Sequence, residues 1–286
     1  MTEGMPVSLT HSATGATFTH LLGGRVIVMQ PVKGYRIGMD GALLAAACAG
    51  LIAEIRPRNK QICRALELGC GVGGALLSLK ARSPDLRLTG IEREPHYLEL
   101  GQENIRLNAV KDVRILAGDI GSGFRTTFSP PDLTAAAGAD VLEGARPHAL
   151  PRFDLVFSNP PYFDEPDALR APHDAKRAAW IADDGLSVWL DFAMAAVKDG
   201  GEIVFIHRAD RLADILSGLM DKCGSFVIRP IQPFNDRSAK RVLVRAQRLG
   251  KSPLRLLPAL ILHDQGDRKH TPEVEAILRG ETTLSW

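Results

Sequence analysis

The hydrophobic pattern of the chain changes at residue 64. From there on, short apolar runs of strand length alternate with longer segments that have helical periodicity. Such alternation is typical of a parallel sheet whose two faces are covered by helices. The sequence predicts strands over residues 64–68, 86–91, 113–119, 153–158, 202–207, 225–231 and 240–247, and helices over 74–82, 94–108, 185–198 and 209–220.

The last two of these strands lie too close in sequence for a crossover helix between them. We therefore expect them to pair antiparallel, because only antiparallel neighbours can be joined by a short connection. The predicted fold is α/β, with a doubly wound, seven-stranded, mostly parallel sheet.

The segment before residue 64 follows a different pattern. Residues 24–40, GRVIVMQPVKGYRIGMD, combine apolar residues with glycines and predict short strands joined by turns. An apolar helix is expected from about Ala42, and Asp40 is well placed to cap it. Residues 1–17 are polar and are expected to form a flexible tail. Residues 121–151 are rich in Ala, Gly and Pro without a clear period, which predicts an inserted, largely flexible loop.

Composition narrows the class of protein only slightly. A chain of 286 residues with 45% hydrophobic content can bury a sizeable core, and a net charge of +2 means that only a local basic patch could meet a nucleic acid. Its four cysteines form no CxxC pair and its eight histidines no ligand cluster, so we expect no metal site and no disulfides. The start lacks a signal-peptide pattern, and Glu54 interrupts the most apolar stretch. We expect a soluble, cytoplasmic protein that contacts no membrane.

A glycine-rich loop, LELGCGVGG at residues 66–74, joins the first predicted strand to the first predicted helix. Glycines allow a tight turn and close approach of a ligand, and the helix start offers unpaired N–H groups. Gly69, Gly71 and Gly74 also fit GxGxxG, and Glu92 ends the second strand where a carboxylate can hold a ribose diol. The loop indicates a nucleotide-like cofactor, either a dinucleotide or S-adenosylmethionine, against the simpler alternative of a turn under close packing.

The fourth predicted strand ends in NPPY, residues 159–162. In a doubly wound sheet this position lies beside the glycine loop, at the edge where ligands bind. Two prolines fix the backbone and remove N–H donors, so nearby carbonyl oxygens are presented as acceptors. Asn159 adds an amide oxygen, and Tyr162 a flat face for stacking. The motif predicts a substrate with an NH2 group, whereas the alternative is a rigid strand end with a packed tyrosine.

Taken together, LELGCGVGG, the acid of GIE, the AGD after the third strand and NPPY resemble class I S-adenosylmethionine-dependent methyltransferases acting on amino groups. The segments GYRIGMDGALLAAA, RVLVRAQRLGKSPLRLLPALILHD and TPEVEAILRG resemble, more closely, bacterial tRNA1(Val) adenine-37 N6-methyltransferases. The resemblance covers roughly residues 18–280, apart from 121–151. It implies an N-terminal extension at 18–60 that packs on the cofactor side, and a Rossmann-like methyltransferase domain at 61–286.

The resemblance also implies roles for the cofactor-binding residues. Glu67, Gly69 and Gly71 would line the methionine part of S-adenosylmethionine, and Glu92 would hold its ribose. Asp119 would accept from the adenine amino group; its alternative role is that of a turn aspartate after a strand.

Asp40 matches an acid of the family's segment before the glycine loop, with the helix cap as the alternative. Asn159, Pro160 and Tyr162 would form the catalytic group, and Asn159 would also lie against the cofactor. Acceptance of both amino hydrogens by the Asn159 side chain and the Pro160 carbonyl would stabilise the developing positive charge, so that no strong base is needed.

Basic residues are frequent late in the chain. Arg241, Arg245 and Arg248 belong to a run without acids and could contact RNA phosphates, or could protect a charged edge strand. The expected partner is RNA, and specifically tRNA. A protein glutamine N5-methyltransferase is the nearest alternative, although such enzymes usually carry a helical domain before the glycine loop. An oxidoreductase or a non-catalytic binding protein is a more distant alternative.

Overall fold

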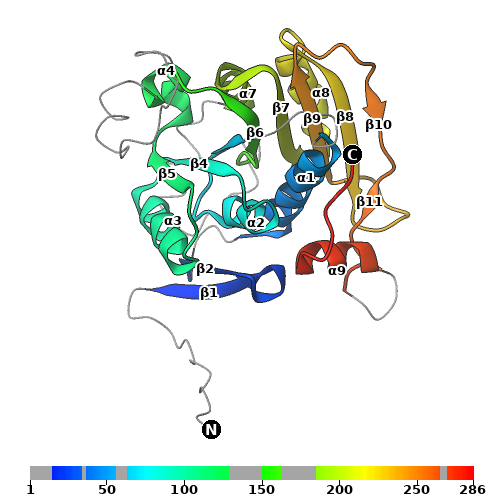
Figure 1. Ribbon diagram of the computed structural model, residues 1–286. Helices are drawn as coiled ribbons and strands as arrows, with labels where there is room; N and C mark the ends of the chain where they lie inside the picture. The colour runs from blue at the N-terminus through cyan, green and yellow to red at the C-terminus, as the bar shows by residue number, and fades with distance from the viewer. Residues whose placement is uncertain (1–14, 34–36, 56–62, 129–149, 163–184, 265–268) are drawn as a thin grey trace.

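The structure is a computed structural model that describes residues 15–33, 37–55, 63–128, 150–162, 185–264 and 269–286 (Figure 1). Its main sheet has the strand order β10-β8-β9-β7-β6-β3-β4-β5, with β11 paired to β8. The seven predicted strands are all present, and β9 runs antiparallel to both of its neighbours, as expected for the last two strands. Their bounds are β3 Arg64–Leu68, β4 Arg87–Glu92, β5 Val113–Ala117, β6 Phe153–Ser158, β7 Val197–Arg208, β8 Cys223–Gln232 and β9 Arg241–Arg248.

Helices cover both faces of this sheet, so the strands between them are buried on both sides. Consecutive residues of β3 alternate between two cores: Ala65 packs with α1 and α2, whereas Leu66 packs with α7 and α8. Burial on both faces explains why the central strands read as nearly continuous apolar runs. The helices are α1 Met39–Ile55, α2 Gly74–Arg82 and α3 Pro95–Leu107 on one face, and α4 Phe124–Thr127, α7 Gly185–Ala196 and α8 Leu212–Leu219 on the other.

An N-terminal hairpin lies apart from the main sheet and packs against α2 and α3 (Figure 1). It consists of β1 Ala16–Leu21 and β2 Val26–Pro31, so regular structure begins within the segment 1–17 that was expected to be a tail. Asn104 of α3 and Asn108, which directly follows this helix, bind the backbone of β2 through their amide groups. Asn104 also donates to the Val72 carbonyl at 3.0 Å. The hairpin is thereby connected to the glycine loop.

The C-terminal segment contributes elements that the hydrophobic pattern did not predict. Two short strands, β10 Arg255–Leu256 and β11 Leu260–Ile261, extend the sheet at β8, and α9 Pro272–Arg279 follows. Beyond α9 the chain crosses α1 so closely that a Cβ on Gly50 would come within 1.9 Å of the Leu284 carbonyl oxygen. Trp286 donates its indole N–H to the Ala47 carbonyl at 2.8 Å, which fixes the chain end on α1.

The start of the predicted loop 121–151 is structured in its described part. A short 3-10 turn, Ile120–Ser122, leads into α4, and the side chains of Phe124 and Phe128 are buried against Phe153 and Phe192. The expectation of a flexible segment is therefore wrong for residues 121–128, because two aromatic side chains anchor it to the core. Residues 129–149 lie outside the described part.

Two general features of the described residues bear on function. None of their helices is long and apolar enough to cross a membrane. Within the same ranges, no group of three or more His, Cys, Asp or Glu side chains is arranged to hold a metal ion.

Candidate active site

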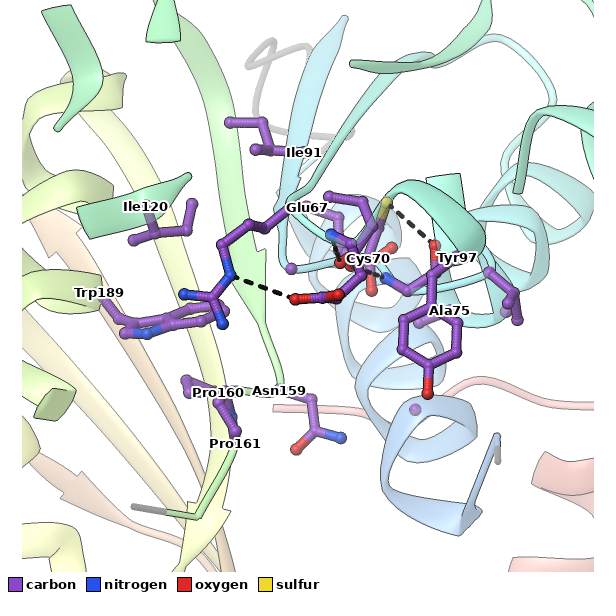
Figure 2. Close-up of a pocket in the computed structure, with 18 of the residues that line it drawn as sticks. Glu67, Cys70, Ala75, Ile91, Tyr97, Ile120, Asn159, Pro160, Pro161 and Trp189 are labelled. Carbon is purple, nitrogen blue, oxygen red and sulfur yellow. Dashed lines mark hydrogen bonds and ion pairs between the residues drawn. The ribbon is translucent and has the colours of Figure 1, made fainter. Parts of the chain in front are cut away.

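A cavity of about 440 Å³ opens at the carboxyl ends of β3, β4 and β6. The strand order reverses here, since β4 and β5 lie on one side of β3 while β6 and β7 lie on the other. Ligands of doubly wound sheets bind at such a reversal. Figure 2 shows Glu67 and Asn159 at the same cavity, with Trp189 and Ile120 on one side and Tyr97 and Ala75 on the other. The cavity thus brings together the glycine loop and the Asn-Pro-Pro-Tyr segment, as the sequence predicted.

The glycine loop has a backbone that side chains would not tolerate. Gly69 has φ +61°, and a Cβ there would lie 2.4 Å from Cη2 of Trp189. Gly71 has φ +55° and donates its N–H to Glu92 at 2.8 Å. At Gly74 a Cβ would meet Ile37 at 2.5 Å. The backbone conformation therefore favours glycine at Gly69 and Gly71, and a side chain at Gly74 would displace Ile37.

Glu67, on β3, is a buried carboxylate at the floor of the cavity. It is 4% exposed, and its Oε2 atom has no hydrogen-bond partner among the described residues. Burial raises the pKa of Glu67 well above its ordinary value; the Leu76 backbone opposes this shift, and the nearby Glu92 adds to it. A buried carboxylate oxygen without a partner is costly in free energy unless a donor or a cation satisfies it. The group fits the positively charged α-amino end of S-adenosylmethionine.

Glu92 ends β4 and holds the loop in shape. One carboxylate oxygen accepts the Gly71 N–H at 2.8 Å, and the other accepts the Glu94 N–H at 2.8 Å. Burial raises the pKa of Glu92, while these backbone hydrogen bonds act in the opposite direction. Each carboxylate oxygen has two lone pairs, so the side chain can still accept from a ribose diol. Its structural role was not predicted from the sequence.

Asp119 lies at the rim of the cavity, after β5. Its Oδ1 atom accepts the Gly121 N–H at 3.0 Å and caps the short 3-10 turn, and the Arg93 guanidinium lies 3.9 Å away. The turn-capping alternative is therefore present in the structure. It does not exclude contact with a cofactor, because Asp119 also lines the cavity.

The Asn-Pro-Pro-Tyr segment continues from β6, which is tied to β3 where Ser158 donates to the Leu68 carbonyl at 2.9 Å. Asn159 and Pro160 follow directly and line the cavity. They share this cavity with Glu67, so acceptor groups and a buried carboxylate lie in one space.

Tyr162 has three partners from three different elements. Its hydroxyl donates to Asp40 Oδ2 at 2.5 Å, the Arg241 guanidinium lies 4.6 Å from its ring centroid, and the His207 ring stands at 90° to it at 5.2 Å. Burial, followed by the Asp40 carboxylate, raises the pKa of Tyr162 above its ordinary range, so the hydroxyl remains a donor. The pKa of His207 is lowered to about 4, chiefly by burial and further by the nearby guanidinium groups of Arg211, Arg208 and Arg241. The Pro161 backbone acts in the opposite direction. The His207 ring is therefore neutral at pH 7.

Asp40 lines the cavity from the first turn of α1. Its Oδ2 atom accepts from both Tyr162 and the Nε of Arg241, the latter at 3.1 Å. Asp40 lies inside α1, which begins at Met39, so it does not precede the helix as a cap would, and both bonds connect α1 to other elements of the site.

The three arginines proposed for RNA do not lie on one open face. Arg241 contacts Asp40 and Tyr162 at the cavity. Arg245 is 8% exposed and pairs with Glu202 at 3.2 Å and with Glu54 at 3.1 Å. Arg248 points to the opposite face of β9 and pairs with Asp199 at 2.6 Å. The expectation of a shared phosphate-binding patch is corrected accordingly: an odd spacing along a strand separates faces, and the acids come from distant segments.

Two contributions were missed from the sequence. Trp189 was predicted to lie in a helix, but its contact with Gly69 depends on how α7 rotates against the sheet. Arg241 was noticed only as part of a basic run, and its contact with residue 162 has no local signal. Residues 163–184, directly after the Asn-Pro-Pro-Tyr segment, lie outside the described residues.

Comparison with known proteins agrees with this geometry. Residues 59–177 match the family model for a methyltransferase domain. Release factor glutamine methyltransferase from Escherichia coli is 30% identical over 174 residues, which cover 57% of this chain and 54% of that protein. tRNA1(Val) (adenine(37)-N6)-methyltransferase from Actinobacillus pleuropneumoniae serotype 7 is 32% identical over 185 residues, 63% of each chain. The chain thus spans little more than half the length of the first relative.

Solved structures show the same fold. A predicted O-methyltransferase from Agrobacterium tumefaciens superposes with a TM-score of 0.62 at 23% identity, covering 86% of this chain and 99% of that one. A putative class I S-adenosylmethionine-dependent methyltransferase from Listeria monocytogenes gives a TM-score of 0.50 at 15% identity, covering 86% and 72%. The predicted Rossmann-like class I methyltransferase fold is confirmed, and so is the resemblance to amino-group methyltransferases.

Proposed function

We propose that this chain, with a methyltransferase domain at residues 59–177, transfers a methyl group from S-adenosylmethionine to an exocyclic amino nitrogen, and that the acceptor is adenine N6 in tRNA. The observation that carries this proposal is the shared cavity of Glu67 and Asn159. One residue is suited to a cationic cofactor and the other to an amino group. A dinucleotide-dependent oxidoreductase would account for the glycine loop and Glu92, and would leave the Asn-Pro-Pro-Tyr segment without a purpose.

Residues of this chain hold the cofactor at three points. Glu67 would accept from the α-amino group, Glu92 from the ribose hydroxyls and Asp119 from the adenine amino group. The cofactor supplies an electrophilic methyl group on a sulfonium. Because Glu67 is buried and its Oε2 atom has no hydrogen-bond partner among the described residues, the bound cation would return this carboxyl to its ionised form.

The acceptor nitrogen is a poor nucleophile, since its lone pair is delocalised into the ring. The Asn159 amide oxygen and the Pro160 carbonyl would accept its two hydrogens and favour a pyramidal nitrogen. As the N–CH3 bond forms and the S–CH3 bond breaks, positive charge develops on the nitrogen, and these acceptors stabilise it. The surplus proton then leaves to solvent. Tyr162 would stack on the base and align the nitrogen with the methyl carbon and sulfur.

Two observations favour adenine in tRNA over a protein glutamine. The segment directly before the glycine loop holds the β1–β2 hairpin and one helix, α1, and a flat ring at residue 162 suits a planar base more than an aliphatic amide.

The test compares acceptors directly. Purified protein would be incubated with methyl-labelled S-adenosylmethionine and either unmodified tRNA1(Val) transcript or unmethylated release factor. We expect label in N6-methyladenosine on nucleoside analysis by mass spectrometry. Label only in the release factor would move the assignment to glutamine N5, and label in neither, with intact cofactor binding, would overturn the tRNA proposal.

A further inference from the structure

The Tyr162 ring is held from two sides by groups that are far away in sequence. Asp40 accepts its hydroxyl from α1, 122 positions earlier in the chain, and Arg241 covers one ring face from the start of β9. The two groups are also bonded to each other, Nε to Oδ2, at 3.1 Å. The three side chains form a closed set of contacts at the cavity, in which each member touches the other two.

We propose that Asp40 and Arg241 are positioning residues that fix the ring plane of Tyr162 before the substrate arrives. The proposal rests on the proposed function, since it assumes that a planar base stacks on this ring. A base would meet the face opposite the guanidinium, because Arg241 occupies the other face.

Fixing this ring matters because methyl transfer requires an in-line arrangement of three atoms. A mobile tyrosine would hold the base in several orientations, of which few are productive, and small displacements of a reacting group can lower a rate greatly. A hydroxyl bonded to a carboxylate keeps the far end of the ring from swinging away, since the oxygen lies on the long axis of the ring. A guanidinium over one face resists rotation of the ring plane about that axis, and the cation–π attraction adds to this restraint.

The electrostatic design is consistent with this role. Asp40 and Arg241 compensate each other's charge, with their side chains 25% and 30% exposed. The perpendicular His207 ring is buried, and it packs against Tyr162 without adding charge at neutral pH. Arg241 therefore acts inside the site through Tyr162, which explains why it does not belong to an open phosphate-binding surface.

The inference makes a different claim about Asp40 from the cofactor-binding role that the resemblance implied. A cofactor ligand would affect affinity for S-adenosylmethionine, whereas a positioning residue would affect turnover. We expect Asp40→Asn, Arg241→Gln and Tyr162→Phe each to lower kcat by about tenfold, as expected for loss of one charge-assisted hydrogen bond or cation–π contact, with cofactor affinity changed less than about threefold.

The activity of a double variant, compared with that of the two single variants, shows whether the residues act together on the ring or independently of each other. Because Asp40 acts on the ring through the Tyr162 hydroxyl and through Arg241, the double variant Asp40→Asn/Tyr162→Phe should lose less activity than the product of the two single losses. Arg241→Lys should recover little, since an ammonium lacks the planar surface that stacks on the ring. Arg237→Gln is the matched control, because this arginine precedes β9, its side chain is 69% exposed and its ion pair is a local one with Asp236. The kcat of this variant should stay at the wild-type value. Additive losses, or weakened cofactor binding with normal kcat, would overturn the inference.

A second measurement does not depend on any acceptor, so it separates this inference from the proposed function. The chain has three tyrosines, and 3-fluorotyrosine labelling gives each a fluorine resonance, with that of Tyr162 assigned by Tyr162→Phe. In the presence of the demethylated cofactor, Asp40→Asn and Arg241→Gln should both change the chemical shift of the Tyr162 resonance. Arg237→Gln should leave that resonance unchanged. An unmoved Tyr162 resonance in both site variants would refute the positioning role even if methyl transfer to tRNA were established. If the wild-type enzyme methylated neither acceptor, the resonance result alone would decide this inference.

Discussion

Glu92 accepts the backbone N–H of Gly71 at 2.8 Å, and through this bond the end of β4 fixes the shape of the glycine loop. Glu92→Ala would leave two N–H donors, of Gly71 and Glu94, without their acceptor. We expect the free energy of unfolding to fall by about 1–3 kcal/mol, the usual effect of unsatisfied buried donors. Cofactor affinity should fall by more than tenfold, because both the ribose acceptor and the loop shape are lost.

Urea unfolding and calorimetric titration with S-adenosylmethionine measure the two effects separately. Glu99→Gln is the control, since Glu99 is exposed on α3 and away from the loop; both quantities should match the wild type. A Glu92→Ala protein as stable as the wild type would show that the loop keeps its shape without this carboxylate, and that Glu92 serves the ligand alone.

Glu67 is predicted to lower the stability of the cofactor-free protein and to raise its affinity for the cofactor. Its pKa is raised by burial, so the folded chain holds this proton more tightly than the unfolded chain. The stability contributed by the neutral carboxyl is present below its ordinary pKa of 4.5 and is lost as pH rises through the raised value. Glu67→Gln should therefore raise the melting temperature of the cofactor-free protein at pH 7 and flatten its decline with pH.

The same substitution should weaken cofactor binding by about 10- to 100-fold, since it removes a charge-assisted hydrogen bond to the amino end. Thermal unfolding between pH 5 and 8, with and without S-adenosylmethionine, gives both results in one series. A variant that is less stable without cofactor, or that binds it normally, would contradict the assignment of Glu67 as the buried partner of a cation.

How far the sequence alone could predict this molecule depends on the range of the interactions involved. β3 and β6 were predicted to the residue, because strands buried on both faces are marked by their own apolar side chains. β10 and β11 were not, since each has only two residues and pairs with β8 through backbone contacts that leave no pattern.

The residues of the site likewise divide into those that a local sequence pattern marks and those that only the packed structure brings together. Gly69, Gly71 and the Asn-Pro-Pro-Tyr segment are local signals, and they lie where the topology of a doubly wound sheet requires. The contact between Asp40 and Arg241 joins residues 201 positions apart, and whether a given arginine of β9 faces a phosphate or an internal acid is decided only by the packed structure. For that reason the basic run was misleading as a predictor of an RNA-binding face.

Arg245 is expected to matter for folding and not for RNA. Its side chain is 10% exposed and pairs with Glu202, which is 2% exposed. Arg245→Gln would leave a buried carboxylate without its cation, a change that typically costs about 3–5 kcal/mol. The free energy of unfolding in urea should fall by that amount, whereas Arg237→Gln, at an exposed pair, should change it by less than about 0.5 kcal/mol. Equal stability of the two variants, together with a reduced salt dependence of tRNA binding in Arg245→Gln, would restore the phosphate-contact hypothesis.

Asn159 provides the sharpest test of the chemistry, because it is proposed to act on the transition state. Asn159→Ala deletes an acceptor at the end of β6 while Pro160, Pro161 and Tyr162 remain. If the bond from the amino group tightens as positive charge develops on nitrogen, kcat should fall by about 100-fold or more with little change in cofactor affinity. Asn159→Asp keeps an acceptor of the same shape and adds negative charge, so it should retain more activity than Asn159→Ala. Single-turnover methyl transfer under saturating cofactor isolates this step from product release. Should Asn159→Ala react as fast as the wild type while remaining folded, the amino-group mechanism would be wrong, and the two prolines would serve only to end a strand.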